Sequence, residues 1–105
     1  MIENIRRCFE DNRVHYTKHA IFEMEHEELG EILDRELEEA ILNGEEIFQY
    51  PEDTPLPSCL IFGQTRNRRP IHVVCAHDEI HDEALIITVY EPDEEQWTDF
   101  RRRKR

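Results

Sequence analysis

The stretch Pro70-Ile-His-Val-Val-Cys-Ala76, followed by Leu85-Ile-Ile-Thr-Val-Tyr90, decides the fold that this sequence predicts. Both segments are short, rich in β-branched residues and free of internal glycine, which is typical of strands with at least one buried face. The polar residues 77–84 between them form the predicted connecting turn. Two adjacent antiparallel strands are therefore expected at the centre of a sheet.

The segments before this pair predict the rest of an α+β fold. Residues 46–50 and 59–63 are further strands, which would complete a four-stranded antiparallel meander. Helices are predicted over residues 2–12, 18–28 and 34–43, with Thr17 as the N-cap of the second, and residues 13–16 are a brief extended segment. Trp97 and Phe100 indicate a short terminal helix. Helices followed by a meander favour two to three N-terminal helices packed on one face of the sheet.

The length of 105 residues indicates a single domain over residues 1–105. Residues 101–105 form a basic tail that is expected to be disordered. No run approaches the ~20 apolar residues of a membrane span and no signal-peptide pattern follows Met1, so we expect a cytoplasmic protein without a membrane partner. The three cysteines include no Cys-x-x-Cys pair and are expected to be buried thiols.

The charge of the chain is strongly acidic and unevenly spread. There are 25 acidic and 13 basic residues, for a net charge of −12, and residues 1–60 hold 16 of the acids against 5 bases. The other bases gather at residues 66–69 and 101–105. Because phosphate binding depends on Lys and Arg, the net charge argues against tight non-specific binding of RNA but leaves two local positive patches.

Several short motifs together resemble the DUF4258 family over about residues 14–98. They are Tyr16-Thr-Lys-His-Ala20, Gly44-Glu-Glu-Ile with Tyr-Pro51, Pro57-Ser-Cys-Leu-Ile61, Arg69-Pro-Ile-His-Val-Val74 and Ile87-Thr-Val-Tyr-Glu-Pro92. That family is similar in predicted fold to the RelE/ParE-type toxins, and some members sit beside a zinc-finger antitoxin of the type paired with MqsR. The resemblance implies a RelE-like toxin component with metal-independent ribonuclease activity, no cofactor, and a zinc-finger or helix-turn-helix antitoxin as partner.

Metal-independent cleavage of RNA needs a base, an acid and cations for the phosphorane charge. His19, in the first turn of a helix, and His72, on the central strand, are the candidates for proton transfer, and Tyr90 would orient the substrate or stack on a base. The alternative is that His19 caps its helix and His72 is a hydrogen-bonded residue of the sheet. The catalytic hypothesis requires His19, His72 and Tyr90 to share one cleft.

Three arginines of a predicted hairpin turn, Arg66, Arg68 and Arg69, are the candidates for phosphate or RNA binding. In the alternative interpretation they form a solvated turn. This chain also carries Phe22, Glu23 and Glu27 where many relatives have arginine on the first helix of the motif. That difference and the net charge favour a second function, a non-catalytic protein-interaction module on the same fold.

Metal binding is a third, competing interpretation. One candidate group is His19, Glu23 and His26, which share a helix face, and the other is His77, Asp78, His81 and Asp82 in the long turn. Neither follows a known zinc motif, and acid-rich segments produce such groups by chance. We therefore assign no metal ligands from the sequence, and the oligomeric state stays open.

Overall fold

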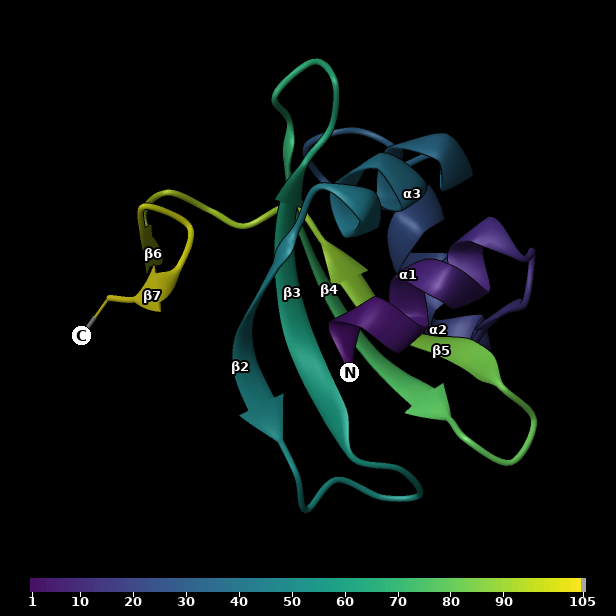
Figure 1. Cartoon of the computed structure of the whole chain (residues 1–105). Coiled ribbons are helices and arrows are strands. Elements are labelled where there is room, and N and C mark those ends of the chain that lie inside the picture. Colours follow the sequence, from purple (N-terminus) through teal and green to yellow (C-terminus); the bar gives the residue numbers. More distant parts are fainter. Residues whose placement is uncertain (105) are drawn as a thin grey trace.

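The structure, a computed structural model, describes residues 1–104, and Arg105 lies outside the described residues. Three helices and seven strands follow one another as α1 (Ile2–Glu10), β1 (Val14–Tyr16), α2 (Lys18–Glu25), α3 (Asp34–Leu42), β2 (Glu45–Tyr50), β3 (Ser58–Gln64), β4 (Pro70–Asp78), β5 (Glu83–Tyr90), β6 (Trp97–Thr98) and β7 (Arg102–Arg103). Figure 1 shows the three helices on one side of the main sheet and the β6–β7 ribbon on the other. No helix within residues 1–104 has the length and apolar character needed to cross a membrane.

The α+β prediction is confirmed, but the sheet has five strands and is mixed. The four predicted strands form the antiparallel meander β2-β3-β4-β5, and β1 adds to β5 in parallel orientation, giving the order β1-β5-β4-β3-β2. The amide of Thr17 donates to the carbonyl of Ile86 at 3.0 Å, and that of Ala84 donates to Arg13 at 2.9 Å. The prediction of four strands was wrong because three residues are too few to show the alternation that identifies a strand.

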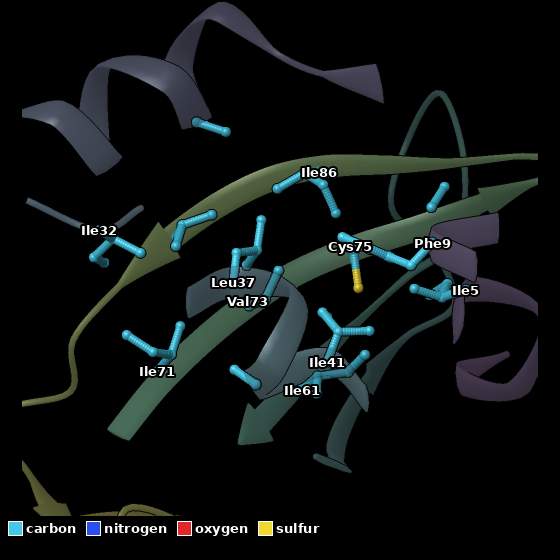
Figure 2. Close-up of a cluster of buried hydrophobic side chains, with 14 of the residues drawn as sticks. Ile5, Phe9, Ile32, Leu37, Ile41, Ile61, Ile71, Val73, Cys75 and Ile86 are labelled. Atoms are coloured by element: carbon cyan, nitrogen blue, oxygen red, sulfur yellow. The ribbon is translucent and has the colours of Figure 1, made fainter. Parts of the chain in front are cut away.

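The core lies between the helices and one face of the sheet. α2 begins as predicted, with the Thr17 hydroxyl accepting from the amide of Ala20 at 3.0 Å. Figure 2 shows how side chains from α1 and α3 meet those of β3, β4 and β5. The fully buried core members include Ile5, Leu37, Ile41, Ile61, Ile71, Val73, Cys75 and Ile86.

Helix α3 approaches β3 so closely that only glycine fits between them. A Cβ atom placed on Gly63 would lie 1.9 Å from the carbonyl oxygen of Ala40, and one on Gly44 would lie 2.5 Å from the same oxygen. Both distances are far inside van der Waals contact. These glycines therefore set the depth at which α3 packs on the sheet.

The opposite face of the sheet, here called the outer face, is partly covered by the C-terminal ribbon. β6 and β7 pair Trp97 with Arg103 and Thr98 with Arg102, so a ribbon stands where the sequence predicted a short terminal helix. Asp99 and Phe100 form its turn with φ of 55° and 59°. Residues 101–104 of the basic tail belong to or adjoin this ribbon, although the sequence predicts disorder there.

Candidate functional site

His72 and Tyr90 meet on the outer face, because alternation along β4 turns His72 away from the core residues Ile71 and Val73. The register places His72 between Phe62 of β3 and Tyr90 of β5. The Nδ1 atom of His72 lies 3.0 Å from the Tyr90 hydroxyl, and its Nε2 atom lies 2.6 Å from the carbonyl oxygen of Phe100. The sequence hypothesis therefore finds two of its three catalytic candidates in direct contact.

The surroundings of His72 keep its ring neutral, and both ring nitrogens have a hydrogen-bond partner. A carbonyl oxygen can only accept, so Nε2 carries the proton and donates to Phe100, while Nδ1 accepts from the Tyr90 hydroxyl. Burial, opposed by the bond to the Phe100 carbonyl, lowers the pKa of His72 to about 4, and the side chain has 0% exposure. Burial likewise raises the pKa of Tyr90 to about 12. His72 cannot exchange a proton with a substrate while the ribbon is in place.

Aromatic side chains seal this pair against the ribbon. The ring centroid of Trp97 lies 4.5 Å from that of His72 with the planes at 87°, and Phe62 stands edge-on at 5.8 Å. Phe100 holds a left-handed φ of 59°, which is rare for a bulky residue and persists only where its surroundings fix it. The hydrogen bond from His72 is one of those constraints. We call these four residues, together with Tyr90, the His72 cluster.

Basic side chains of the ribbon border the His72 cluster. The Arg101 guanidinium lies 4.8 Å from the centroid of the Phe62 ring and is paired with Glu45. The Arg103 guanidinium lies 5.6 Å from the Trp97 ring centroid. Arg102, Arg103 and Lys104 line an open hollow beside Phe48 and Thr98. We call these three residues the basic margin.

His19 lies on the other side of the sheet. It belongs to α2, whose Ala20 and Met24 are part of the core beneath the helices. Its side chain is 67% exposed, and its Nε2 atom is 3.3 Å from a Glu23 oxygen. The structure therefore brings His72 and Tyr90 together and leaves His19 apart from them. A cleft shared by all three, which the catalytic hypothesis requires, is not formed.

Arg69, at the end of the turn between β3 and β4, joins three segments of the chain. Its Nε atom donates to Glu91 at 2.6 Å, and its Nη1 atom donates to Glu36 at 3.2 Å and to the carbonyl of Glu31 at 2.8 Å. The carbonyl of Gly30 accepts from Nη2. Arg69 and its two carboxylate partners are 15–18% exposed. Carboxylates and backbone carbonyls of the chain itself therefore accept from all three nitrogens of the Arg69 guanidinium, which leaves no free edge for a phosphate.

The other two arginines of the turn are exposed. Arg66 is 87% exposed and its Nε atom lies 3.5 Å from a Glu39 oxygen. Arg68 has a φ of 64° and lines a hollow together with Glu94 and Glu95. Neighbouring carboxylates lower the positive potential that a phosphate would meet at both positions. The predicted phosphate site is therefore surrounded by acids.

A groove between α2 and the start of α3 combines apolar and acidic side chains. Its volume is about 360 Å³. It is lined by Tyr16, Ile21, Met24, Glu25, Glu31, Ile32, Leu33 and Asp34. Ile21 and Leu33 are 45% and 40% exposed, and burial and the carboxylates of Asp34 and Glu38 raise the pKa of Tyr16 to about 12. We call this surface the acidic groove.

Sequence reasoning did not identify the acidic groove. The spacing of Ala20, Ile21 and Met24 predicts one apolar stripe facing the core, but only Ala20 and Met24 are buried. Phe22, which follows Ile21, is 61% exposed. Ala20 and Met24, four residues apart, already fill the core-facing positions of this short acidic helix, so the presence of two further apolar residues was the available signal.

The metal-ligand candidates are rearranged by folding. Within residues 1–104, His19, Glu23 and His26 do not form a compact ligand group. The long turn divides in two: Asp78 and His81 join Glu83 in one group, whereas His77 and Asp82 join Cys8 of α1 in another. The second group includes a residue far away in the sequence, which spacing along the turn could not reveal.

Comparison with family models gives a match over residues 16–91 to the family described as "Domain of unknown function (DUF4258)". The matched range contains the acidic groove, His72, Tyr90 and the arginine turn, but neither α1 nor the C-terminal ribbon. Comparisons with curated proteins and with solved structures give no significant match.

Proposed function

Because the chain belongs to the DUF4258 family, whose description names no activity, we propose a function from the geometry of this member. The protein is a non-catalytic interaction module, and its acidic groove binds a basic, partly apolar segment of a partner protein. The observation that carries this proposal is the coincidence of exposed Ile21 and Leu33 with three carboxylates in one groove. Apolar surface with a polar rim is the pattern of a protein-binding site.

Charge selects the kind of partner. Glu25, Glu31 and Asp34 stand at the groove, in the part of the chain that holds most of the excess acid. Lysine or arginine of the partner would pair with these carboxylates, while its apolar side chains would cover Ile21 and Leu33. Opposite charge also speeds association and suppresses acidic competitors.

The partner that the resemblance suggests is an antitoxin. In this proposal the chain has a RelE-like fold without the ribonuclease activity of a toxin, and the zinc-finger or helix-turn-helix protein that binds it carries a basic, DNA-binding surface. The packing of all helices on one sheet face is compatible with such a fold. The antitoxin would cover the acidic groove and would leave the outer face open.

Calorimetric titration with the purified product of the neighbouring gene tests this proposal. The double variant Glu25→Gln/Glu31→Gln and the variant Leu33→Ala are each expected to weaken binding by about tenfold or more. The control Glu52→Gln/Glu79→Gln removes the same charge from exposed positions outside the groove. Equal binding by the groove variants and the control would remove the groove from the interface.

A second function, RNA binding on the outer face, rests on a separate observation. Tyr90 is half-buried beside the basic margin, where the positive charge of Arg103 acts to lower the pKa of its hydroxyl, against the larger effect of burial. Aromatic rings with adjacent cations bind single-stranded RNA by stacking and phosphate contact. Cleavage would require the ribbon to move, because His72 is sealed beneath it.

Titration of labelled single-stranded RNA at two salt concentrations tests the second function. Arg102→Gln/Arg103→Gln is expected to reduce both the affinity and its salt dependence, while Arg66→Gln leaves them unchanged. Expression without a partner, with RNA integrity followed against the His72→Ala variant, tests cleavage. Wild type that neither slows growth nor cuts RNA would exclude the ribonuclease.

A further inference from the structure

A cluster of metal-ligating side chains joins α1 to the β4–β5 hairpin. Cys8 comes from α1, His77 from β4 and Asp82 from the turn between β4 and β5, and their ligand atoms lie within 4.8 Å of one another. The cluster shares no residue with the acidic groove or the His72 cluster. Cys8 lies outside the range matched by the family model, so this combination of ligands is not a property of the matched domain alone.

The three side chains converge on one carboxylate oxygen. The Oδ1 atom of Asp82 lies 2.8 Å from the Nε2 atom of His77 and 3.8 Å from the sulfur of Cys8. The carbonyl oxygen of Asp82 lies 3.5 Å from the same sulfur. Cys8 is 1% exposed and the His77 side chain 10%, so two of the ligands are held by their surroundings.

We propose that Cys8, His77 and Asp82 bind a zinc ion, with the fourth coordination position open to water. A thiolate, an imidazole and a carboxylate form a donor set that suits Zn²⁺ and disfavours Ca²⁺ and Mg²⁺, which prefer oxygen ligands throughout. Tetrahedral zinc holds its ligand atoms roughly 3.2–3.8 Å apart. The sulfur already stands at that distance from the carboxylate, and the His77–Asp82 contact has to open by about half an ångström.

The ion would replace cations that are easily displaced. Arg7 donates to Asp82 at 2.7 Å, and Arg13 lies 3.8 Å from it, but these side chains are 43% and 54% exposed. Ion pairs this exposed contribute little to stability, so Arg7 can turn toward solvent and open the carboxylate. Binding sends the Cys8 thiol proton to solvent and leaves a thiolate on the metal.

The test uses the full-length chain without a histidine tag. Added Co²⁺ is expected to bind at one ion per chain and to give the near-ultraviolet absorption of a cobalt thiolate, which Zn²⁺ then abolishes by displacement. Cys8→Ser is expected to lose that absorption. His77→Gln and Asp82→Asn are expected to weaken zinc binding by about tenfold or more, measured against a chromophoric chelator.

The control His81→Gln changes an exposed histidine of the same hairpin and is expected to bind zinc like wild type. Zinc should also raise the melting temperature of wild type but not of Cys8→Ser, since only ligand bound to the folded state stabilises it. Circular dichroism establishes that each variant is folded. Because each of the three ligand variants tests the site separately, one variant that fails to fold does not prevent the test. Cobalt absorption that survives in Cys8→Ser, zinc binding lost in His81→Gln, or no stoichiometric binding by wild type would each overturn the proposal.

Discussion

Acid is expected to weaken the fold through His72. Its pKa is lowered from 6.5 to about 4 in the folded chain, chiefly by burial. When the pH falls below 6.5, the unfolded chain takes up a proton on His72 while the folded chain does not. The unfolded state thus binds more protons between pH 6.5 and about 4, and the free energy of unfolding falls across this window. Below the pKa of about 4 that His72 has in the folded chain, both states carry the proton and the free energy of unfolding falls no further through this residue.

The size of the effect follows from the same two values. A pKa lowered from 6.5 to about 4 corresponds to about 3 kcal/mol of stability at neutral pH. This is a large part of the ~5–15 kcal/mol that stabilises a typical domain. Because His72 bonds to the carbonyl of Phe100, the ribbon is expected to detach first, which tryptophan fluorescence of Trp97 would report.

The measurement is urea unfolding of wild type and of His72→Phe at several pH values from 7.5 to 4. At pH 7.5 the variant should be less stable by about 2–4 kcal/mol, because the Tyr90 hydroxyl and the Phe100 carbonyl lose their partner. The two curves should converge toward pH 4. Tyr90→Phe serves as the control and should keep most of the pH dependence, since burial is the main cause of the lowered pKa. Parallel curves for wild type and His72→Phe would refute the reasoning.

Three further predictions concern stability and use urea unfolding followed by circular dichroism. Arg69→Met should cost about 2–4 kcal/mol, because it leaves largely buried carboxylates without their cation, whereas Arg66→Met should change stability by less than ~0.5 kcal/mol; similar losses would contradict the assignment. Gly63→Ala should cost about 2 kcal/mol or more, because the new methyl group collides with the Ala40 carbonyl, and a neutral result would show that α3 can move away. Thr17→Ala should cost about 1 kcal/mol by removing the helix cap, and an unchanged midpoint would mean that solvent replaces the hydroxyl.

Local sequence patterns were enough to predict most of the helices and strands of the fold. The four longer strands and the three helices were found because alternation and helical spacing are properties of a few consecutive residues. Thr17 was recognised as a cap from its position before an apolar stripe. β1 was seen as an extended segment but not as a member of the sheet, since its parallel pairing with β5 depends on residues about 70 positions away.

The candidate site was much less predictable. Only the register of β4 and β5 sets Tyr90 opposite His72. Alternation predicted the side of β4 on which His72 lies, away from Ile71 and Val73. It could not show that the C-terminal ribbon would cover that face and bury His72. The sequence also could not show that Arg69 is enclosed by carboxylates, or that Ile21 opens onto a groove with Leu33.

The sequence alone therefore determined the order of the three helices and the four longer strands, the side of β4 on which His72 lies, and the acidic charge of the chain. These depend on local periodicity and on composition. The tertiary structure decided which side chains meet: His72 with Phe100, Cys8 with His77 and Asp82, and the residues of the acidic groove. These contacts are between segments that are distant in the sequence and that only packing brings together. The accessibility and protonation of a side chain depend on such neighbours and not on the residue type alone.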